Sequence, residues 1–341
     1  MQYVKLGIGN KNALHLITTG GLKNMSIETM SVQDMRSYKG TDRRPDDFEE
    51  FWRSRTDALS KLNISYELIP ADFQVKGSKC SDLYFTSFDS SGIHCKVAVP
   101  DRPGRFPVLF YYHGYKADSL DWWHKVFWAD RGFCIVAMDV RGQGGRSQDI
   151  AAGTGSTAIG HLASGIEGEI DDMTFAKVYK DIICMVNLVS SFSFTDETKL
   201  YVHGGSQGGA LSLVTAALFG NVKKAAVLYP FLSDFRRVYA LGAAGSAYEE
   251  LIYIFRYGDP LHLREDEYFK KLAYIDVKNF APMIKADVLM ATGLSDEICP
   301  ASTQFAVYNN LTCKKRHLIY PDFGHEPDLP GCLDECCTFL T

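Results

Sequence analysis

From residue 106 onward, short apolar runs alternate with amphipathic stretches of helical length. The apolar runs, each ended by Gly, Pro or Asp, are PVLFYYHG, GFCIVAMDVRG, KLYVHGGSQGG, AAVLYP, ADVLMATG and RHLIYPDFG. Helical stretches such as DDMTFAKVYKDIICMVNLVSSF and GALSLVTAALFG lie between them. Buried apolar strands that alternate with amphipathic helices indicate a parallel sheet with helices on both faces. The sequence therefore predicts an α/β fold with a mostly parallel central sheet.

The rest of the chain is organised around this core. Residues 1–29 show neither helical nor strand periodicity, and we expect a loose N-terminal extension there. Residues 30–341 are predicted to form a single domain, which opens with an aromatic helix containing residues 48–52 and continues with antiparallel strands over residues 66–99. Residues 232–280 lack strand patterns and are rich in Tyr and charge. We predict that they form a helical insertion over the carboxyl end of the sheet, near the active site.

Composition excludes several classes of function. The 36 basic and 41 acidic side chains leave a net charge of −5, without the basic surface that nucleic-acid binding needs. No apolar run approaches the ~18 residues of a membrane-spanning helix. The first residues lack the apolar core of a secretory signal. Most of the nine cysteines stand singly in apolar stretches, so we expect reduced thiols and a cytoplasmic protein.

The strongest chemical signal is Gly204-Gly205-Ser206-Gln207-Gly208, which fits G-x-S-x-G. It follows the strand LYVH and precedes the helix GALSLVTAALF, the context that a nucleophile elbow requires. The tight turn leaves room only for small residues two positions before and after the serine. Ser206 is therefore the predicted nucleophile, and the alternative is an ordinary glycine turn.

A serine hydroxyl needs a general base that removes its proton. In this arrangement the partners follow the serine in the order acid, then histidine. Three histidines lie downstream of Ser206. His262 lies in the polar insertion and His317 begins a strand, whereas His325 follows the strand RHLIYP in the loop PDFGHEP. His325 is the predicted base, and the alternative is a surface loop histidine.

The acid should end the preceding strand, because it orients the imidazole and stabilises its charged form. Asp296 follows the strand DVLMATG and is the predicted acid. Its neighbour Glu297 and the more distant Asp322 are the alternatives, as is a helix N-cap role for Asp296.

Acyl transfer also needs N–H donors that bind the oxyanion. The residue after the nucleophile supplies one donor, here the backbone N–H of Gln207. His113-Gly114-Tyr115 follows an early strand, at the place of the HG element in lipases, so the N–H of Tyr115 is the predicted second donor. The alternative is that His-Gly merely ends a strand.

The glycine-rich loop at residues 141–146 does not have the spacing of a phosphate-binding loop. We expect Arg141 instead to bind a carboxylate through two N–H groups and connect loops beneath the site. His113 and His124 are too scattered for a metal site, and the cysteines at 332–337 lack a histidine at zinc spacing. We therefore expect neither a metal nor a cofactor.

The chain resembles the acetyl xylan esterase/cephalosporin-C deacetylase group, carbohydrate esterase family 7. The matching segments, in the order of that family, are PDDFEEFW, YHGY, VRGQ, GGSQGG, YPFLSDF, GLSDEICPAST and FGHE, and they cover roughly residues 30–330. The resemblance implies an α/β-hydrolase fold and removal of O-acetyl groups from small sugars such as acetylated xylo-oligosaccharides, and from cephalosporin C. It also implies a cytoplasmic homohexamer, a triad of Ser206, Asp296 and His325, and an oxyanion hole at Tyr115 and Gln207.

Two competing hypotheses stay open. The first is a serine peptidase of the prolyl-oligopeptidase type, although the roughly 100 residues that precede the core are too few for the large module those enzymes carry. The second is a catalytically silent α/β-hydrolase that serves as a binding module, although candidates for all three triad residues are present. The predicted partners are small acetylated sugars and further copies of the chain, without nucleic acid or membrane.

Overall fold

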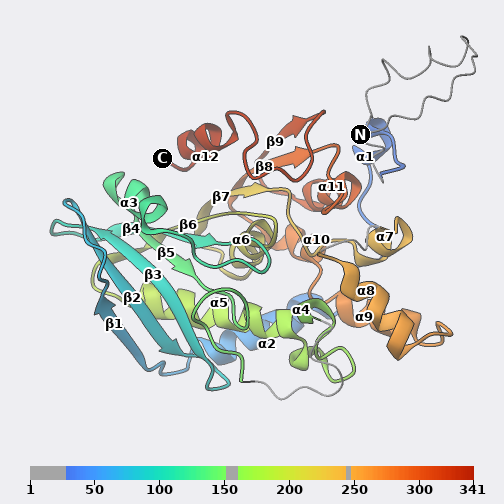
Figure 1. Cartoon of the computed structure of the whole chain (residues 1–341), viewed down its shortest axis with the longest axis horizontal. Helices are drawn as coiled ribbons and strands as arrows, with labels where there is room; N and C mark the ends of the chain where they lie inside the picture. Colours follow the sequence, from blue (N-terminus) through green and yellow to red (C-terminus); the bar gives the residue numbers. More distant parts are fainter. Residues whose placement is uncertain (1–27, 151–159, 243–246) are drawn as a thin grey trace, which may run out of the picture.

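The structure is a computed structural model that describes residues 28–150, 160–242 and 247–341. The strands of this described part form one nine-stranded sheet in the order β1-β2-β3-β5-β4-β6-β7-β8-β9 (Figure 1). The strands are β1 (Tyr66–Pro70), β2 (Ser78–Thr86), β3 (Gly92–Pro100), β4 (Phe106–Tyr112), β5 (Cys134–Met138), β6 (Thr195–Gly205), β7 (Val222–Leu228), β8 (Asp287–Gly293) and β9 (Lys315–Tyr320). Strands β1 to β3 pair antiparallel, β3 pairs antiparallel with β5, and all other pairs are parallel. The predicted mostly parallel sheet is confirmed.

The apolar runs of the central strands are buried on both faces, whereas the edge strand β9 is only half-buried. All five side chains of β5 are buried, as expected for a strand inside a parallel sheet. The chain crosses from β3 to β4 and returns to β5, which lies between them. Since β4 to β9 run in one direction, their carboxyl ends meet at one edge. The loops that carry the predicted site residues all leave this edge.

Helices cover both faces of the sheet (Figure 1). One face packs against α3 and α12, and the other against α2, α5 and α6. The helices are α1 (Val32–Met35), α2 (Phe48–Leu59), α3 (Trp122–Asp130), α4 (Gly160–Ala163), α5 (Thr174–Ser190), α6 (Gln207–Leu218), α7 (Phe235–Ala240), α8 (Glu249–Tyr253), α9 (Glu265–Leu272), α10 (Val277–Phe280), α11 (Ala301–Asn310) and α12 (Cys332–Leu340), with short 3-10 turns η2 (Ile170–Asp172) and η4 (Ala281–Met283) and a π-helical turn η3 (Ile254–Gly258). Phe48 and Trp52, one helical turn apart in α2, are fully buried, as the aromatic pattern predicts.

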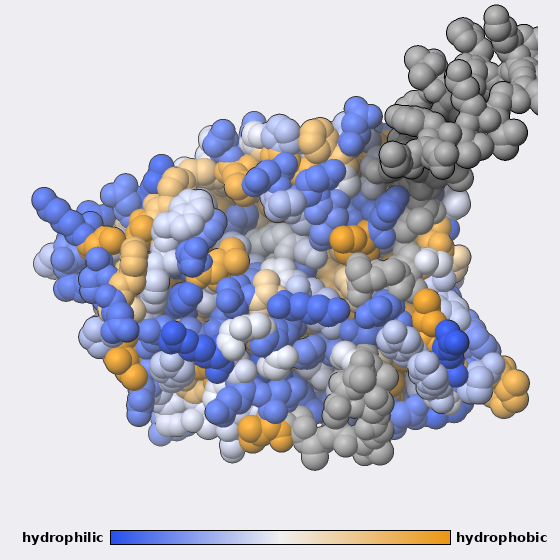
Figure 2. Space-filling model, viewed as in Figure 1, coloured by the Kyte–Doolittle hydropathy of each residue, from blue (hydrophilic) through white to orange (hydrophobic). Residues whose placement is uncertain are grey.

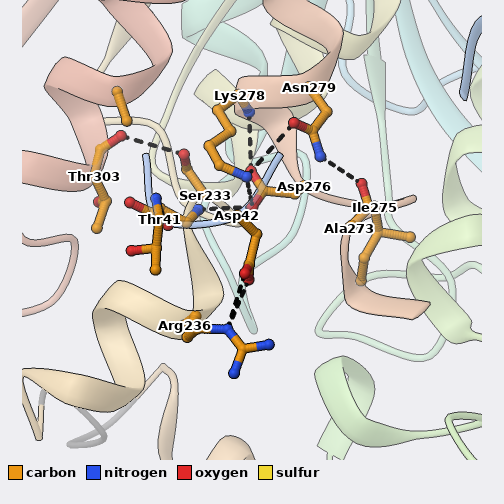
Figure 3. Close-up of polar contacts among 12 residues, drawn as sticks. Thr41, Asp42, Ser233, Arg236, Ala273, Ile275, Asp276, Lys278, Asn279 and Thr303 are labelled. Carbon is orange, nitrogen blue, oxygen red and sulfur yellow. Dashed lines mark hydrogen bonds and ion pairs between the residues drawn. The ribbon is translucent and has the colours of Figure 1, made fainter. Parts of the chain in front are cut away.

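The described residues of the predicted insertion form α7, α8, η3, α9 and α10. Polar contacts hold this region to the N-terminal part of the chain (Figure 3). Arg236 binds the Asp42 carboxylate at 2.9 Å, and Asp234 accepts a 3.0 Å bond from the backbone N–H of Thr41. Asp276 is buried and paired with Lys278 at 2.9 Å, and one of its oxygens accepts the backbone N–H of Asp234. The insertion is therefore held to residues 41–42 and is also joined internally through Asp276.

Several sequence expectations concern the whole chain. The predicted extension over residues 1–29 falls, up to residue 27, outside the described residues, and the domain boundaries stay a prediction. The nine cysteines all lie in the described part and none of them is in a disulfide, as expected. No helix of the described ranges has both the length and the apolarity needed to cross a bilayer.

Candidate active site

Ser206 occupies a strained turn between β6 and α6. Its φ of 57° and ψ of −121° lie outside the regions that most residues with a side chain adopt. A Cβ on Gly208 would lie 2.0 Å from the carbonyl oxygen of Tyr112, and one on Gly204 would lie 2.6 Å from the backbone of Gly208. The small residues of the motif are thus a steric requirement. The predicted strand–turn–helix context of Ser206 is confirmed.

His325 and Asp296 form a hydrogen-bonded pair on the loops that follow β9 and β8. The Nδ1 atom of His325 lies 2.8 Å from Oδ2 of Asp296. An ionised carboxylate makes Nδ1 the donor, which leaves Nε2 of the imidazole free to accept a proton. The two rivals for the acid, Glu297 and Asp322, are both exposed. The geometry therefore favours Asp296 as the partner of His325.

The Asp296 carboxylate is held in place from several directions. It is fully buried. Its Oδ1 atom accepts the backbone N–H groups of Ile298 at 2.9 Å and Cys299 at 2.8 Å, and its Oδ2 atom also accepts the side-chain amide of Gln304 at 3.0 Å. These donors compensate the burial of a charge and fix the carboxylate toward His325.

Ser206 and His325 follow strands that end at the same edge of the sheet, and Tyr229 lies beside both His325 and Gly205, the residue before Ser206. The Tyr229 ring centroid is 4.3 Å from that of His325, and a Cβ on Gly205 would be 3.3 Å from the same tyrosine ring. The Tyr229 hydroxyl donates to the carbonyl of Glu326 at 3.0 Å, next to His325 in the chain. No hydrogen bond joins Ser206 to His325 within the described residues. Such catalytic hydrogen bonds are often long before substrate binds.

Cys299 lies near the predicted nucleophile, which the sequence did not indicate. The Ser206 side chain is close enough to lower the pKa of the Cys299 thiol, and the backbone N–H of Cys299 binds Asp296. Burial raises the pKa of the Cys299 thiol well above its usual range. The thiol therefore stays neutral and is not a competing nucleophile. This residue brings the acid loop beside the elbow.

The two predicted oxyanion donors have free N–H groups. Within the described residues, the backbone N–H of neither Tyr115 nor Gln207 has a hydrogen-bond acceptor. The imidazole of His113 shapes the loop before Tyr115. Its Nε2 accepts the N–H of Val140 at 3.0 Å, so its Nδ1 carries the proton and donates to the carbonyl of Gly114 at 2.7 Å. Burial lowers the pKa of His113, which keeps this tautomer neutral.

Gln143 connects the two oxyanion loops, a role that sequence reasoning missed. Its amide nitrogen donates to Oε1 of Gln207 at 2.8 Å, and its own carbonyl oxygen accepts the backbone N–H of Lys116 at 2.9 Å. The only local signal was its place in the glycine-rich loop after β5, and spacing alone does not show what such a loop contacts.

Arg141 connects loops beneath the site, as predicted. Its side chain is fully buried, and it binds Asp181 through Nε at 2.7 Å and Nη2 at 2.6 Å. Its Nη1 atom also binds Asp89 at 2.6 Å. Two-point binding of a carboxylate by a buried guanidinium fixes both partners in orientation.

In the described part of the chain, no group of three or more His, Cys, Asp or Glu side chains is placed to hold a metal ion. The expected lack of a metal and of a cofactor stays a prediction. It is based on chemistry, because a serine, a histidine and a carboxylate can carry out acyl transfer without either.

Comparison with known proteins agrees with this geometry. The acetyl xylan esterase (AXE1) family matches residues 25–341. The chain belongs to this family. Its members are carboxylic ester hydrolases, and the fold is the α/β-hydrolase fold that the resemblance implied.

Two solved structures of this family are similar over most of the chain. Acetyl xylan esterase 1 from Thermoanaerobacterium sp. JW/SL YS485 is 45% identical with a TM-score of 0.88, and the match covers 91% of this chain and 98% of that one. Acetyl xylan esterase from Paenibacillus sp. R4 is 34% identical with a TM-score of 0.84, covering 91% and 99%.

More distant relatives extend the comparison. Acetyl esterase Axe7A from Xylanibacter ruminicola is 27% identical over 289 residues, which is 83% of this chain and 64% of that protein. This chain therefore spans less than two thirds of the length of that relative. The acylaminoacyl peptidase from Pyrococcus horikoshii shares the fold alone, at 16% identity and a TM-score of 0.56.

Proposed function

We propose that this chain removes O-linked acetyl groups from small acetylated carbohydrates, acetylated xylo-oligosaccharides in particular, through a covalent acetyl-enzyme. The observation that carries the proposal is the strained Ser206 elbow at the edge of the sheet. At the same edge, His325 binds a buried Asp296 whose two carboxylate oxygens both accept hydrogen bonds. Membership of the acetyl xylan esterase family supports the acetyl ester as the bond that is cleaved.

In the proposed reaction, the Ser206 hydroxyl oxygen attacks the ester carbonyl while Nε2 of His325 takes its proton. The carbonyl oxygen becomes negatively charged and is bound by the N–H groups of Tyr115 and Gln207. Collapse of this intermediate expels the sugar oxygen, which receives the proton from His325. Water then attacks the acetyl-serine with His325 again as the base, and acetate leaves. Asp296 stabilises the imidazolium in both halves.

Acetate release tests this function directly. Acetylated mono- and xylo-oligosaccharides are incubated with the wild type and with Ser206→Ala, and acetate is measured over time. We expect release by the wild type and a loss of several orders of magnitude in the variant. Equal release by both proteins would contradict the proposal.

The same experiment separates the competing activities. A parallel arm compares p-nitrophenyl acetate, p-nitrophenyl octanoate and an aminoacyl-naphthylamide. Cleavage of the aminoacyl-naphthylamide without acetate release would favour the peptidase, whose support here is the fold alone. No activity on any substrate would favour the silent binding module.

Three finer properties belong to the proposal and rest on the family resemblance. These are deacetylation of cephalosporin C, a cytoplasmic location and assembly into a homohexamer. Free thiols at all nine cysteines are compatible with a reducing compartment.

A further inference from the structure

A polar cavity lies beside the predicted oxyanion hole. Its volume is about 340 Å³, and its walls come from the loops after β4 and β5 and from the first turns of α4 and α8. Tyr115 and Gln143 both line it. Tyr115 is one of the two predicted oxyanion donors, and Gln143 binds the side chain of the other, Gln207. The cavity therefore shares Tyr115 with the predicted oxyanion hole.

Glu250 gives this cavity a fixed wall. Its buried carboxylate accepts the Tyr115 hydroxyl at 2.5 Å and the backbone N–H groups of Leu162 and Ala163 in α4. The Tyr115 hydroxyl in turn accepts the backbone N–H of His161 at 3.2 Å. These bonds hold the tyrosine ring, Glu250 and the start of α4 together, so this wall is formed without a ligand.

The remaining lining side chains suit a ligand with hydroxyl groups. Glu249 and His161 are half-buried in the wall, and within the described residues the Glu249 carboxylate has no hydrogen-bond partner. Burial lowers the pKa of His161, and backbone hydrogen bonds to Arg141 and Gly142 partly offset this effect. A neutral imidazole that donates to the backbone keeps its other ring nitrogen as an acceptor. A sugar hydroxyl both donates and accepts, and it matches such a lining, whereas an acyl chain would leave these groups unpaired.

We infer that this cavity is the subsite for the sugar part of the ester, with Glu249 and His161 binding hydroxyl groups of the glycosyl unit next to the acetyl group. The volume lies at the small end of ligand pockets and fits a mono- or disaccharide rather than a polymer chain. The inference rests on the proposed function, because it assigns the leaving group of that reaction.

Kinetics on two substrates tests the subsite. Glu249→Ala and His161→Ala are compared with wild type on acetylated xylobiose and on p-nitrophenyl acetate, which has no sugar. We expect kcat/KM for the sugar ester to fall roughly five- to tenfold in each variant, mainly through KM, since one hydrogen bond is lost. Activity on p-nitrophenyl acetate should stay within about twofold, which also shows that the variants fold.

Matched controls and a binding measurement complete the test. Glu67→Ala on β1 and His124→Ala on α3 change the same residue types away from the cavity lining, and should leave both substrates unaffected. Free xylobiose should inhibit p-nitrophenyl acetate hydrolysis in the wild type, and more weakly in the two cavity variants.

The outcomes separate the two claims. If both cavity variants keep the wild-type kcat/KM on acetylated xylobiose, the subsite alone is overturned. The same holds if kcat/KM falls equally on acetylated xylobiose and p-nitrophenyl acetate. A wild type that cleaves p-nitrophenyl acetate but no acetylated sugar overturns the proposed function, and the subsite with it.

Discussion

At the scale of single residues, the candidate site residues could be predicted where their role requires a particular local sequence around them. Ser206 is fixed by glycines two positions away on either side, so the pattern in the sequence is the steric requirement itself. His325 and Asp296 each follow an apolar strand, and strand ends in a parallel sheet meet at one edge. Gln143 and Cys299 could not be predicted in the same way, because their roles depend on contacts with Gln207 and Ser206, which are far away in the chain.

The proposed acid, Asp296, gives the first prediction at this scale. Asp296→Asn keeps the shape of the side chain but favours the wrong histidine tautomer, because the amide nitrogen donates where the carboxylate accepts. We expect kcat for p-nitrophenyl acetate to fall roughly 10³- to 10⁴-fold. Glu297→Gln and Asp322→Asn, at the two exposed rivals, should keep near wild-type rates. A larger loss in either rival than in Asp296→Asn would assign the acid elsewhere.

The second residue-scale prediction concerns the elbow. In Gly208→Ala the added methyl would meet the Tyr112 carbonyl, so the backbone must shift. We expect a destabilisation of about 1–3 kcal/mol and loss of esterase activity. Gly220→Ala is the matched control, because nothing lies within 4 Å of its Cβ position. Thermal unfolding and hydrolysis rates measure both effects, and an active, unshifted Gly208→Ala protein would disprove the steric account.

At the scale of elements, periodicity predicted which segments form strands and helices. It did not predict every local irregularity or every buried polar side chain. The expected strands and the helices α2, α5 and α6 are all present. The π-helical turn η3 was not anticipated, because it interrupts a segment without a distinctive pattern. Within α3, Lys125 is fully buried, although lysine is ordinarily an exposed residue. Its ammonium donates to the carbonyls of Ser119 and Asp121 rather than to a carboxylate.

Lys125 should make stability depend on pH. Burial, with a smaller effect of nearby Lys96, lowers its pKa to about 7. Between pH 7 and its ordinary value near 10.5, the unfolded chain binds a proton that the folded chain does not, so this group favours folding more as pH rises. Relative to Lys125→Met, the wild type should gain about 1 kcal/mol per pH unit between pH 7 and 9. Thermal unfolding at both pH values checks this, and a relative loss by the wild type contradicts it.

At the scale of the whole molecule, the sequence indicated the fold class but not how distant segments pack. Residues 38–42 contact the insertion through Asp234 and Arg236, an arrangement that no local pattern encodes (Figure 3).

The insertion also carries exposed apolar side chains. Tyr257, Leu261 and Leu263 are 71%, 76% and 81% exposed on the insertion, and Figure 2 shows apolar surface at the right-hand edge, where Figure 1 places the tip before α9. Clustered exposed apolar side chains are typical of contact surfaces.

The proposed assembly is measurable in solution. Light scattering coupled to size exclusion should give six times the 38.1 kDa of the chain, as the family resemblance implies. We expect replacement of Leu261 and Leu263 by Ser to lower that mass, because exposed apolar side chains of this kind are typical of contact surfaces. A wild type that elutes as a monomer would contradict the proposed homohexamer while leaving the site chemistry untouched.

The central claim is that Ser206 is the activated nucleophile of this molecule. A fluorophosphonate reacts with a serine hydroxyl that a neighbouring base has activated, and it leaves a stable covalent adduct. Intact-mass measurement followed by peptide mapping should find one adduct per chain, on Ser206, and none on the Ser206→Ala variant. An unlabelled wild type, or a label on any other residue, would contradict the account.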